Sequence, residues 1–146
     1  MEIGKILIAS DHGGYALKEK LKPYLSELGY KYEDLGCHSE KSVDYPDYAK
    51  KVAAQVLETN GLGILICGTG IGMSISANKI SGVRAALCYN DYTARMSREH
   101  NNANILCMGG RVLETKQAKR ILKIWLETPF SGDERHKRRI EKVNCI

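Results

Sequence analysis

The stretch at residues 62–76, LGILICGTGIGMSIS, constrains what this chain can fold into more than any other part of it. Residues 63–67 form a short apolar run, which is typical of a parallel strand buried on both faces. Alternating glycines then break the strand, and the sequence after them can form a helix. A strand, a glycine turn and a helix start, in that order, hold anions on backbone N–H groups. Cys67, at the last position of the strand, places a thiol beside that turn.

Strand-like and helix-like segments alternate along the whole chain. We expect strands at residues 3–9, 30–35, 63–67, 83–89 and 105–108, with helices following them. One domain, residues 1–146, should result. Its predicted fold class is α/β, a three-layer α/β/α Rossmann-like fold with a five-stranded parallel sheet, helices on both faces and an extra C-terminal helix. The strand order does not follow from the pattern.

Several helix boundaries can also be predicted. Pro23 should kink or split the first helix, and Gly29 should close it. Asp44 is a candidate N-cap for the second helix. The inward positions of that second helix should be Ala49, Val52, Ala53, Val56 and Leu57. The segment at 133–143 has too few apolar residues to bury a face on its own.

Composition narrows the class of function. The net charge of +5 comes partly from a basic cluster at residues 135–139, but no aromatic stacking pattern or groove-reading motif accompanies it, so we expect no nucleic-acid partner. No apolar run approaches the ~20 residues of a membrane span, and the N-terminus resembles a first strand rather than a signal peptide. We therefore expect a cytoplasmic protein with no membrane partner. Five widely spaced cysteines without a CxxC pair argue against a disulfide framework and a zinc cluster.

In an open parallel sheet the ligand lies outside the carboxyl ends of the strands. The polar turns at residues 10–14, 68–72, 90–91 and 109–111 should all lie there, and we expect Asp11, His12 and His100 to converge with Cys67 at this edge. Each residue also has a simpler explanation. Asp11 could cap a helix, His12 could be solvated, and His100 could stabilise a helix end. Cys67, like Cys88 and Cys107, could merely pack as a small apolar residue.

The glycine turn reads GxGxG, with Met73 where a dinucleotide fingerprint has its third glycine, and it lacks the Lys-Ser/Thr ending of a P-loop. Two kinds of chemistry remain. Cys67 could be a nucleophile that attacks an acyl or phosphoryl centre, or a base that moves a proton next to a carbonyl while turn N–H groups stabilise an enediolate. A low-molecular-weight phosphatase loop would need an arginine after the cysteine, and none follows at that spacing. Its absence favours proton transfer.

Five motifs together resemble one family, ribose-5-phosphate isomerase B and its sugar-phosphate isomerase relatives. They are DHGG at 11–14, DYP at 44–46, ILICGTGIG at 64–72, SREHN at 97–101 and RHKRR at 135–139. The resemblance spans essentially the whole chain. It implies an aldose–ketose isomerase of the pentose phosphate pathway that interconverts D-ribose 5-phosphate and D-ribulose 5-phosphate. Relatives that isomerise allose 6-phosphate or galactose 6-phosphate make a hexose phosphate the alternative substrate, and a non-catalytic sugar-phosphate-binding protein is a further alternative.

The resemblance also implies roles for particular residues. Cys67 would be the base and His100 the acid that opens the sugar ring, with Asp11 nearby. The other implied site residues are His12, Gly68, Thr69, Gly70, Ile71, Gly72, Asn101, Arg111, Arg135 and Arg139, of which the three arginines would bind phosphate. The family needs no metal or organic cofactor. It forms homodimers, or dimers of dimers, with shared active sites, so the last helix of this chain would lie against a partner.

Overall fold

Residues 4–146, which the structure describes, form five strands and six helices in a computed structural model. The strands are β1 (Ile6–Ser10), β2 (Tyr32–Asp34), β3 (Leu62–Cys67), β4 (Ala85–Leu87) and β5 (Ile105–Gly109). The helices are α1 (Tyr15–Glu27), α2 (Tyr45–Thr59), α3 (Ile71–Asn78), α4 (Asp91–Glu99), α5 (Thr115–Glu127) and α6 (Glu134–Asn144). Every strand pair is parallel, and the strand order is β2-β1-β3-β5-β4.

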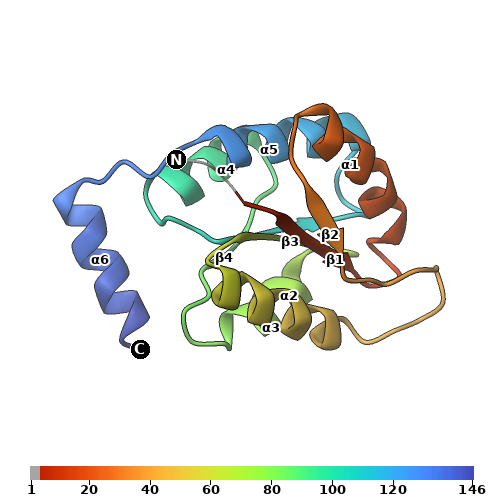
Figure 1. The fold of residues 1–146 in the computed structure, drawn as a ribbon, viewed down its shortest axis with the longest axis horizontal. Helices are drawn as coiled ribbons and strands as arrows, with labels where there is room; N and C mark the ends of the chain where they lie inside the picture. The colour runs from red at the N-terminus through yellow and green to blue at the C-terminus, as the bar shows by residue number, and fades with distance from the viewer. Residues whose placement is uncertain (1–3) are drawn as a thin grey trace.

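The sheet separates two layers of helices, which confirms the predicted three-layer α/β/α fold (Figure 1). Alternate strand residues such as Ile64 and Ile66 pack with α1, α4 and α5 on one face. Their neighbours Leu65 and Cys67 pack with α2 and α3 on the other face. Because both faces are covered, β1, β3 and β5 read as continuous apolar runs, almost entirely buried.

The strand order locates the ligand edge. Starting from β1 the chain moves outward to β2 and then returns across β1 to β3, so the order reverses between the neighbours β1 and β3. Such a reversal opens a crevice at the carboxyl ends of the two strands, where ligands of open α/β sheets bind. Asp11 follows β1 and Cys67 ends β3. Ser10 pairs with Ile66, so Asp11 and Cys67, the next residue in each strand direction, come from the ends of neighbouring strands.

The two outer strands are shorter than predicted. The structure has β2 at 32–34 and β4 at 85–87, where the sequence predicts 30–35 and 83–89. Each lies at an edge and pairs on one side, so fewer residues stay in register with a twisting sheet. The first strand runs over Ile6–Ser10 rather than 3–9, and the predicted start at Ile3 lies outside the described residues.

The helix predictions hold except in three details. α1 runs without interruption from Tyr15 to Glu27 with Pro23 inside it, so the proline does not split the helix. Asp44 is at the N-cap of α2 but its side chain makes no capping hydrogen bond. Leu57, predicted to be buried, is 41% exposed, since it lies beyond the inward stripe and over Gly82. Gly29 ends α1 with a φ of 91°, as predicted.

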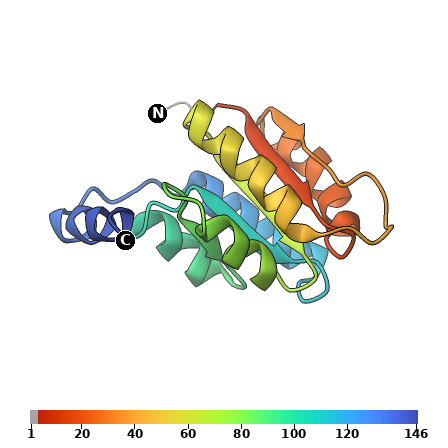
Figure 2. The same ribbon diagram turned by 90° about the horizontal axis from the view of Figure 1, so that it is seen from below.

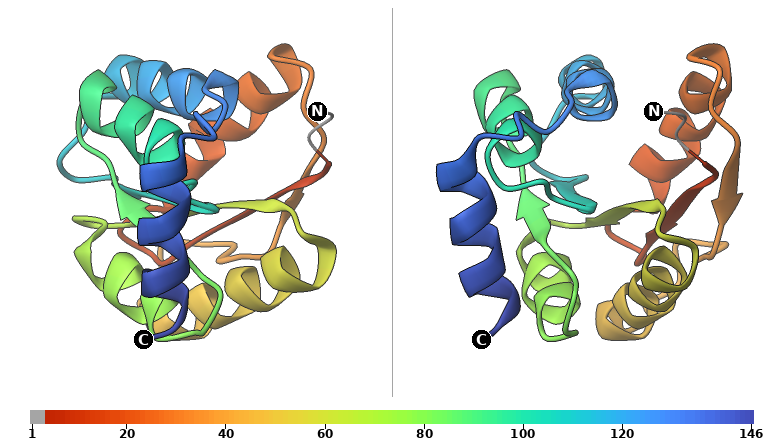
Figure 3. Two further views of the ribbon diagram at one scale, coloured as in Figure 1. Left: turned by 90° about the vertical axis from the view of Figure 1, so that its left-hand side faces the viewer. Right: turned by 60° about the vertical axis from the view of Figure 1, so that its left-hand side comes forward.

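Helix α6 stands beside the layers, next to the β4 side of the molecule (Figures 1 and 3). Of its 11 residues, all of them described, His136 alone is buried. Between α6 and the start of β4 is a cleft of about 490 Å³, and its lining includes Ile80, Val83, Ile140 and Val143. A helix that leaves its apolar residues on an open cleft has little to hold it within its own chain.

Candidate active site

The turn after β1 holds a fixed carboxylate. Asp11 is 6% exposed, and its Oδ1 accepts hydrogen bonds from the N–H groups of Gly13 (2.9 Å) and Gly14 (3.2 Å). The carboxylate therefore caps the turn that leads into α1. A Cβ added at Gly14 would lie 2.3 Å from the carbonyl oxygen of Ile66, so only glycine lets this turn approach β3 so closely.

His12 is held from one side of its ring. Its Nδ1 accepts a hydrogen bond of 3.1 Å from the N–H of Val43, in the loop between β2 and α2. A neutral imidazole that accepts at Nδ1 carries its proton on Nε2. The bond therefore presents an Nε2–H donor away from Val43, as a group that binds an anion requires.

Cys67 ends β3 at the crevice between the strands. Its side chain is 4% exposed, and its Sγ accepts a hydrogen bond of 3.1 Å from the N–H of Gly70. Gly70 has a φ of 82°, in the left-handed region that glycine adopts without strain, and this conformation turns its N–H back toward the sulfur. An N–H aimed at sulfur stabilises negative charge on it. The turn also engages a second amide, since Thr69 Oγ1 accepts the N–H of Ile71 at 3.2 Å.

Arg111, after β5, bridges the two glycine turns. Its N–H donates to the carbonyl of Gly68 (2.9 Å), and its guanidinium lies over two glycines. A Cβ added at Gly13 would be 3.4 Å from Arg111 Cζ, and one at Gly68 would be 3.3 Å from Nη1. Because both positions lack side chains, the guanidinium lies directly on the turns after β1 and β3. The turn after β1 also carries His12, the residue before Gly13.

Tyr45 lies against the glycine turn, although the sequence analysis named it only within the DYP motif and gave it no role. A Cβ added at Gly72 would be 2.6 Å from its Cε1 and 2.7 Å from its Cζ, so the ring lies against the glycine turn. The side chain is 40% exposed. Its position directly before Pro46, in one of the motifs that carry the family resemblance, is the feature of the sequence that could have indicated a functional role for Tyr45.

His100 lies elsewhere, and the expectation that it converges with Cys67 within one chain is wrong. Helix α4 starts near the carboxyl end of β4 and carries the chain back, so its C-cap His100 lies near the amino ends of the strands. At that end of the sheet Ile105 of β5 pairs with Gly63 of β3, and Gly63 lies four residues before Cys67. Four steps of ~3.3 Å separate the two levels by about 13 Å. Figure 2 shows the turns after β1, β3 and β5 at one end of the molecule and α6 at the other.

A second group of polar residues gathers around His100. Its ring stacks on that of His136 in α6, with centroids 4.2 Å apart and planes at 16°. The carbonyl of Asn101 accepts a hydrogen bond of 3.2 Å from Arg84 Nε, and Arg84 Nη1 reaches Asn144 Oδ1 at 3.3 Å. These contacts join the end of α4 to α6, which carries Arg135 and Arg139. His100, Asn101 and the two arginines therefore belong to one unit.

His136 was missed by sequence reasoning, because a histidine within a basic cluster carries no local signal. It is 5% exposed, and among the described residues its Nε2 has no hydrogen-bond partner. Burial lowers the pKa of His136, and the nearby His100 and Arg135 lower it further. The stack with His100 therefore favours a neutral ring at position 136.

Cys88 and Cys107 are packing residues. Cys107 is fully buried, and burial raises its pKa far above the ordinary value, with Cys67 and Cys88 adding to the effect. Burial also raises the pKa of Cys88, although a hydrogen bond with Ser97 opposes the shift. A thiol that resists ionisation is a poor base, so these two cysteines serve as internal controls for Cys67.

Two further observations concern the described residues only. Within residues 4–146, no three His, Cys, Asp or Glu side chains form a group that could hold a metal ion. None of the helices in this part of the chain is both long enough and apolar enough to cross a membrane.

Known proteins resemble this chain along nearly its full length. The family model described as Ribose/Galactose Isomerase matches residues 6–143. Ribose-5-phosphate isomerase B of Escherichia coli is 44% identical over 144 residues, which cover 97% of this chain and 95% of that protein. The ribose 5-phosphate isomerase structure from Thermotoga maritima is 51% identical with a TM-score of 0.95, covering 99% of this chain and 100% of that one. The structure of ribose-5-phosphate isomerase B from Clostridium thermocellum is 51% identical with a TM-score of 0.93, covering 96% of this chain and 95% of that one. The chain belongs to the ribose/galactose isomerase family and is an isomerase.

Proposed function

We propose that the protein interconverts D-ribose 5-phosphate and D-ribulose 5-phosphate, with Cys67 as the base. The observation that carries the proposal is the Cys67 Sγ held at 3.1 Å from the N–H of Gly70, in the crevice where the strand order reverses. A buried sulfur that faces a backbone N–H is suited to carry the negative charge that a base needs before it takes a proton and again after it returns that proton. The proteins similar to this chain include several named ribose-5-phosphate isomerase.

The proposed reaction begins with the opening of the sugar ring. His100 donates a proton to the ring oxygen as its bond to C1 breaks, and the C1 hydroxyl gives its proton to water and becomes the aldehyde oxygen. Cys67 then removes the proton from C2, and the electron pair of that C–H bond moves to form the C1–C2 double bond while the carbonyl oxygen becomes an enediolate oxygen. N–H groups of the 68–72 turn stabilise this oxygen. The C2 hydroxyl then passes its proton to the C1 oxygen, which leaves the negative charge on the C2 oxygen. As the C2 carbonyl forms, the electron pair of the C1–C2 double bond takes the proton back from sulfur at C1, which gives the ketose and restores the thiolate.

We further propose that two copies of the chain build each site. One copy supplies Cys67, and the partner supplies the unit of His100, Asn101 and α6, because one chain holds these groups at opposite ends of its sheet. Helix α3, which follows the glycine turn, exposes Ile71 (51%) and Ile75 (63%) one turn apart. A homodimer that covers this face and the cleft beside α6 would bury both apolar surfaces.

The phosphate would then be held from both sides. Arg111 and His12 present donors from the copy that carries Cys67. Arg135 and Arg139, one helical turn apart on α6 and both exposed, would approach from the partner. Guanidinium groups suit this role because they donate two parallel hydrogen bonds to phosphate.

The test compares Cys67→Ala with Cys107→Ala and Cys88→Ala on ribose 5-phosphate. Loss of a general base should lower kcat by roughly 10²- to 10⁴-fold in Cys67→Ala, while the two buried controls keep near-normal turnover. Circular dichroism should show all three variants folded. A near-normal rate in Cys67→Ala would remove the proton-transfer role.

Substrate identity is tested on the unmodified protein, with allose 6-phosphate and galactose 6-phosphate beside ribose 5-phosphate. A hexose phosphate is the second candidate because the family description covers galactose as well as ribose. The highest kcat/KM on a hexose phosphate would make that sugar the substrate. No turnover of any of the three would favour a sugar-phosphate-binding protein.

A further inference from the structure

The loop between β2 and α2, residues 35–44, crosses the carboxyl edge of the sheet (Figure 2). At its start, the carbonyl of Gly36 accepts the N–H of Ser10 (2.8 Å), and the N–H of Cys37 donates to the carbonyl of Ser10 (2.9 Å). At its end, Val43 donates to His12 Nδ1. The loop therefore touches the residues immediately before and after Asp11.

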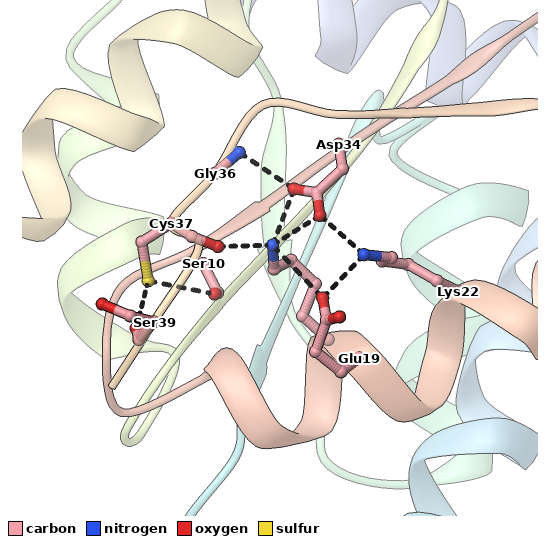
Figure 4. A network of polar contacts seen from close by, with 8 residues as sticks. Ser10, Glu19, Lys22, Asp34, Gly36, Cys37 and Ser39 are labelled. Atoms are coloured by element: carbon pink, nitrogen blue, oxygen red, sulfur yellow. Dashed lines mark hydrogen bonds and ion pairs between the residues drawn. The ribbon is translucent and has the colours of Figure 1, made fainter. Parts of the chain in front are cut away.

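A buried lysine holds the start of this loop. Lys18 in α1 is 0% exposed, and its Nζ donates to Asp34 Oδ1 (2.6 Å), Asp34 Oδ2 (2.7 Å) and the carbonyl oxygen of Cys37 (2.7 Å). Figure 4 shows these three oxygens converging on one ammonium group. An ammonium has three N–H donors, and these hydrogen bonds direct them to the end of β2 and the start of the loop, while Glu19 of α1 forms a longer ion pair with the same group at 3.6 Å.

The carboxylate links the lysine to the loop a second time. Asp34 Oδ1 also accepts the N–H of Gly36 at 2.9 Å, and its Oδ2 accepts Lys22 Nζ at 2.9 Å. Burial by itself would raise the pKa of Asp34, but hydrogen bonds from Lys18, Gly36 and Lys22 outweigh it and lower that pKa. The side chain is thus an anion that binds two cations and one loop amide.

Stability alone does not account for a fully buried ammonium group. Removing an ion from water costs several kcal/mol, and a buried ion pair often stabilises a fold no better than apolar residues of the same size. Geometry gives this pair a distinct effect, because it fixes backbone groups of Gly36 and Cys37. A leucine or methionine at position 18 would fill the space without fixing either group.

We propose that Lys18 is a positioning residue for His12. Through Asp34 and Cys37 it holds the β2–α2 loop at the angle that brings the Val43 N–H to His12 Nδ1, and so keeps the His12 proton on Nε2, facing the anion. Among the described residues, the Lys18 ammonium makes its hydrogen bonds with Asp34 and Cys37 and none with a residue of the candidate site. The effect on catalysis rests on the proposed function, in which His12 binds the sugar phosphate, whereas the effect on the His12 ring does not.

The experiment uses the double variant Lys18→Met/Asp34→Asn, which removes both charges together and leaves no unpaired buried ion. Nitrogen NMR of the histidine rings reports the His12 tautomer, and steady-state kinetics report KM and kcat. We expect the unmodified protein to show His12 with its proton on Nε2 and the double variant to show a mixture of tautomers. KM for ribose 5-phosphate should rise roughly three- to ten-fold, the range of one lost hydrogen bond, with a smaller change in kcat.

Lys22→Met is the matched control. It removes a cation from the same carboxylate of Asp34, but Lys22 makes no contact with Cys37 in the described structure, so the tautomer and KM should stay as in the unmodified protein. A second variant, Val43→Pro, removes the final N–H of the same path and should reproduce both effects without altering the buried pair.

Either variant can overturn the proposal. A folded double variant with an unchanged His12 tautomer and unchanged KM would do so, and if that variant does not fold, an unchanged tautomer in Val43→Pro has the same force. The NMR result is independent of turnover. If the unmodified protein fails to isomerise ribose 5-phosphate while the tautomer shifts as expected, the proposed function is wrong and the role of Lys18 stands.

Discussion

Chains that carry Cys67→Ala and chains that carry His100→Ala should recover activity when they are mixed. In the proposed dimer each site takes its cysteine from one chain and its histidine from the other. A dimer of the two different variants therefore contains one site with both substitutions and one site with neither. Each variant alone should be inactive, because every one of its sites lacks either the base or the acid.

The recovered activity can be worked out from this geometry. Random pairing of equal amounts gives about half mixed dimers, each with one intact site of two, so the mixture should show about a quarter of the unmodified activity. If Cys67 and His100 of the same chain worked together, the recovery would be zero. The separation of about 13 Å between their levels in the sheet, from four strand steps, excludes direct contact within one chain.

The assay follows ribulose 5-phosphate formation after the two variants are unfolded together and refolded, with each variant refolded alone as the blank. A second mixture provides an independent check, in which unmodified chains are paired with chains that carry both substitutions. Shared sites predict about a quarter of full activity there, since every site in a mixed dimer is damaged, whereas sites within one chain predict about half. No recovery in the first mixture together with half activity in the second would refute the shared site.

Two further predictions concern stability. Gly14→Ala should destabilise the protein by more than ~3 kcal/mol, because its Cβ would lie 2.3 Å from the carbonyl oxygen of Ile66. The control Gly4→Ala, whose Cβ would meet nothing within 4 Å, should change the free energy of unfolding by less than ~0.5 kcal/mol. Equal urea midpoints for the two variants would contradict this prediction. The pKa of His136 lies below its ordinary 6.5 in the folded protein, so the unfolded chain binds the proton first and stability falls as the pH drops below that value. His136→Phe keeps a stacked ring that does not titrate, and should therefore lose less stability between about pH 7.5 and about pH 5.5 in urea unfolding at one protein concentration; parallel losses would show that His136 does not titrate in this way.

Much of the fold follows from local patterns. Short apolar runs such as 63–67, bounded by glycines, are typical of buried strands. The inward stripe of α5, which includes Trp125, has the period of a helix. Glycines at positions 29 and 70 mark the two turns where the structure has φ values of 91° and 82°. The glycine turn and the thiol of Cys67 beside it could be predicted for the same reason, since the strand end that carries Cys67 and the turn are consecutive in the chain.

Contacts between segments that are far apart in the chain could not be predicted from the sequence. Strand order places β1 beside β3 and so brings Asp11 to the crevice that holds Cys67, while pairing of edge strands decides how short β2 and β4 become. The bond between Val43 and His12 and the burial of Lys18 likewise join segments far apart in sequence. Local periodicity carries no information about such pairs, because it depends on which faces are apolar and not on which segments meet.

His100 shows most clearly what tertiary structure alone decided. Its motif, next to Asn101, indicated a functional residue, and the sequence analysis assigned it to the edge that holds Cys67. A helix between parallel strands must return the chain from the carboxyl edge to the amino edge, so the two ends of α4 lie at opposite edges. The sequence by itself determined that the chain carries a cysteine beside a glycine turn, a His–Asn pair at 100–101 and a basic cluster at 135–139. The three-dimensional path determined that one chain keeps them apart, since residues at opposite ends of parallel strands cannot meet without a second copy.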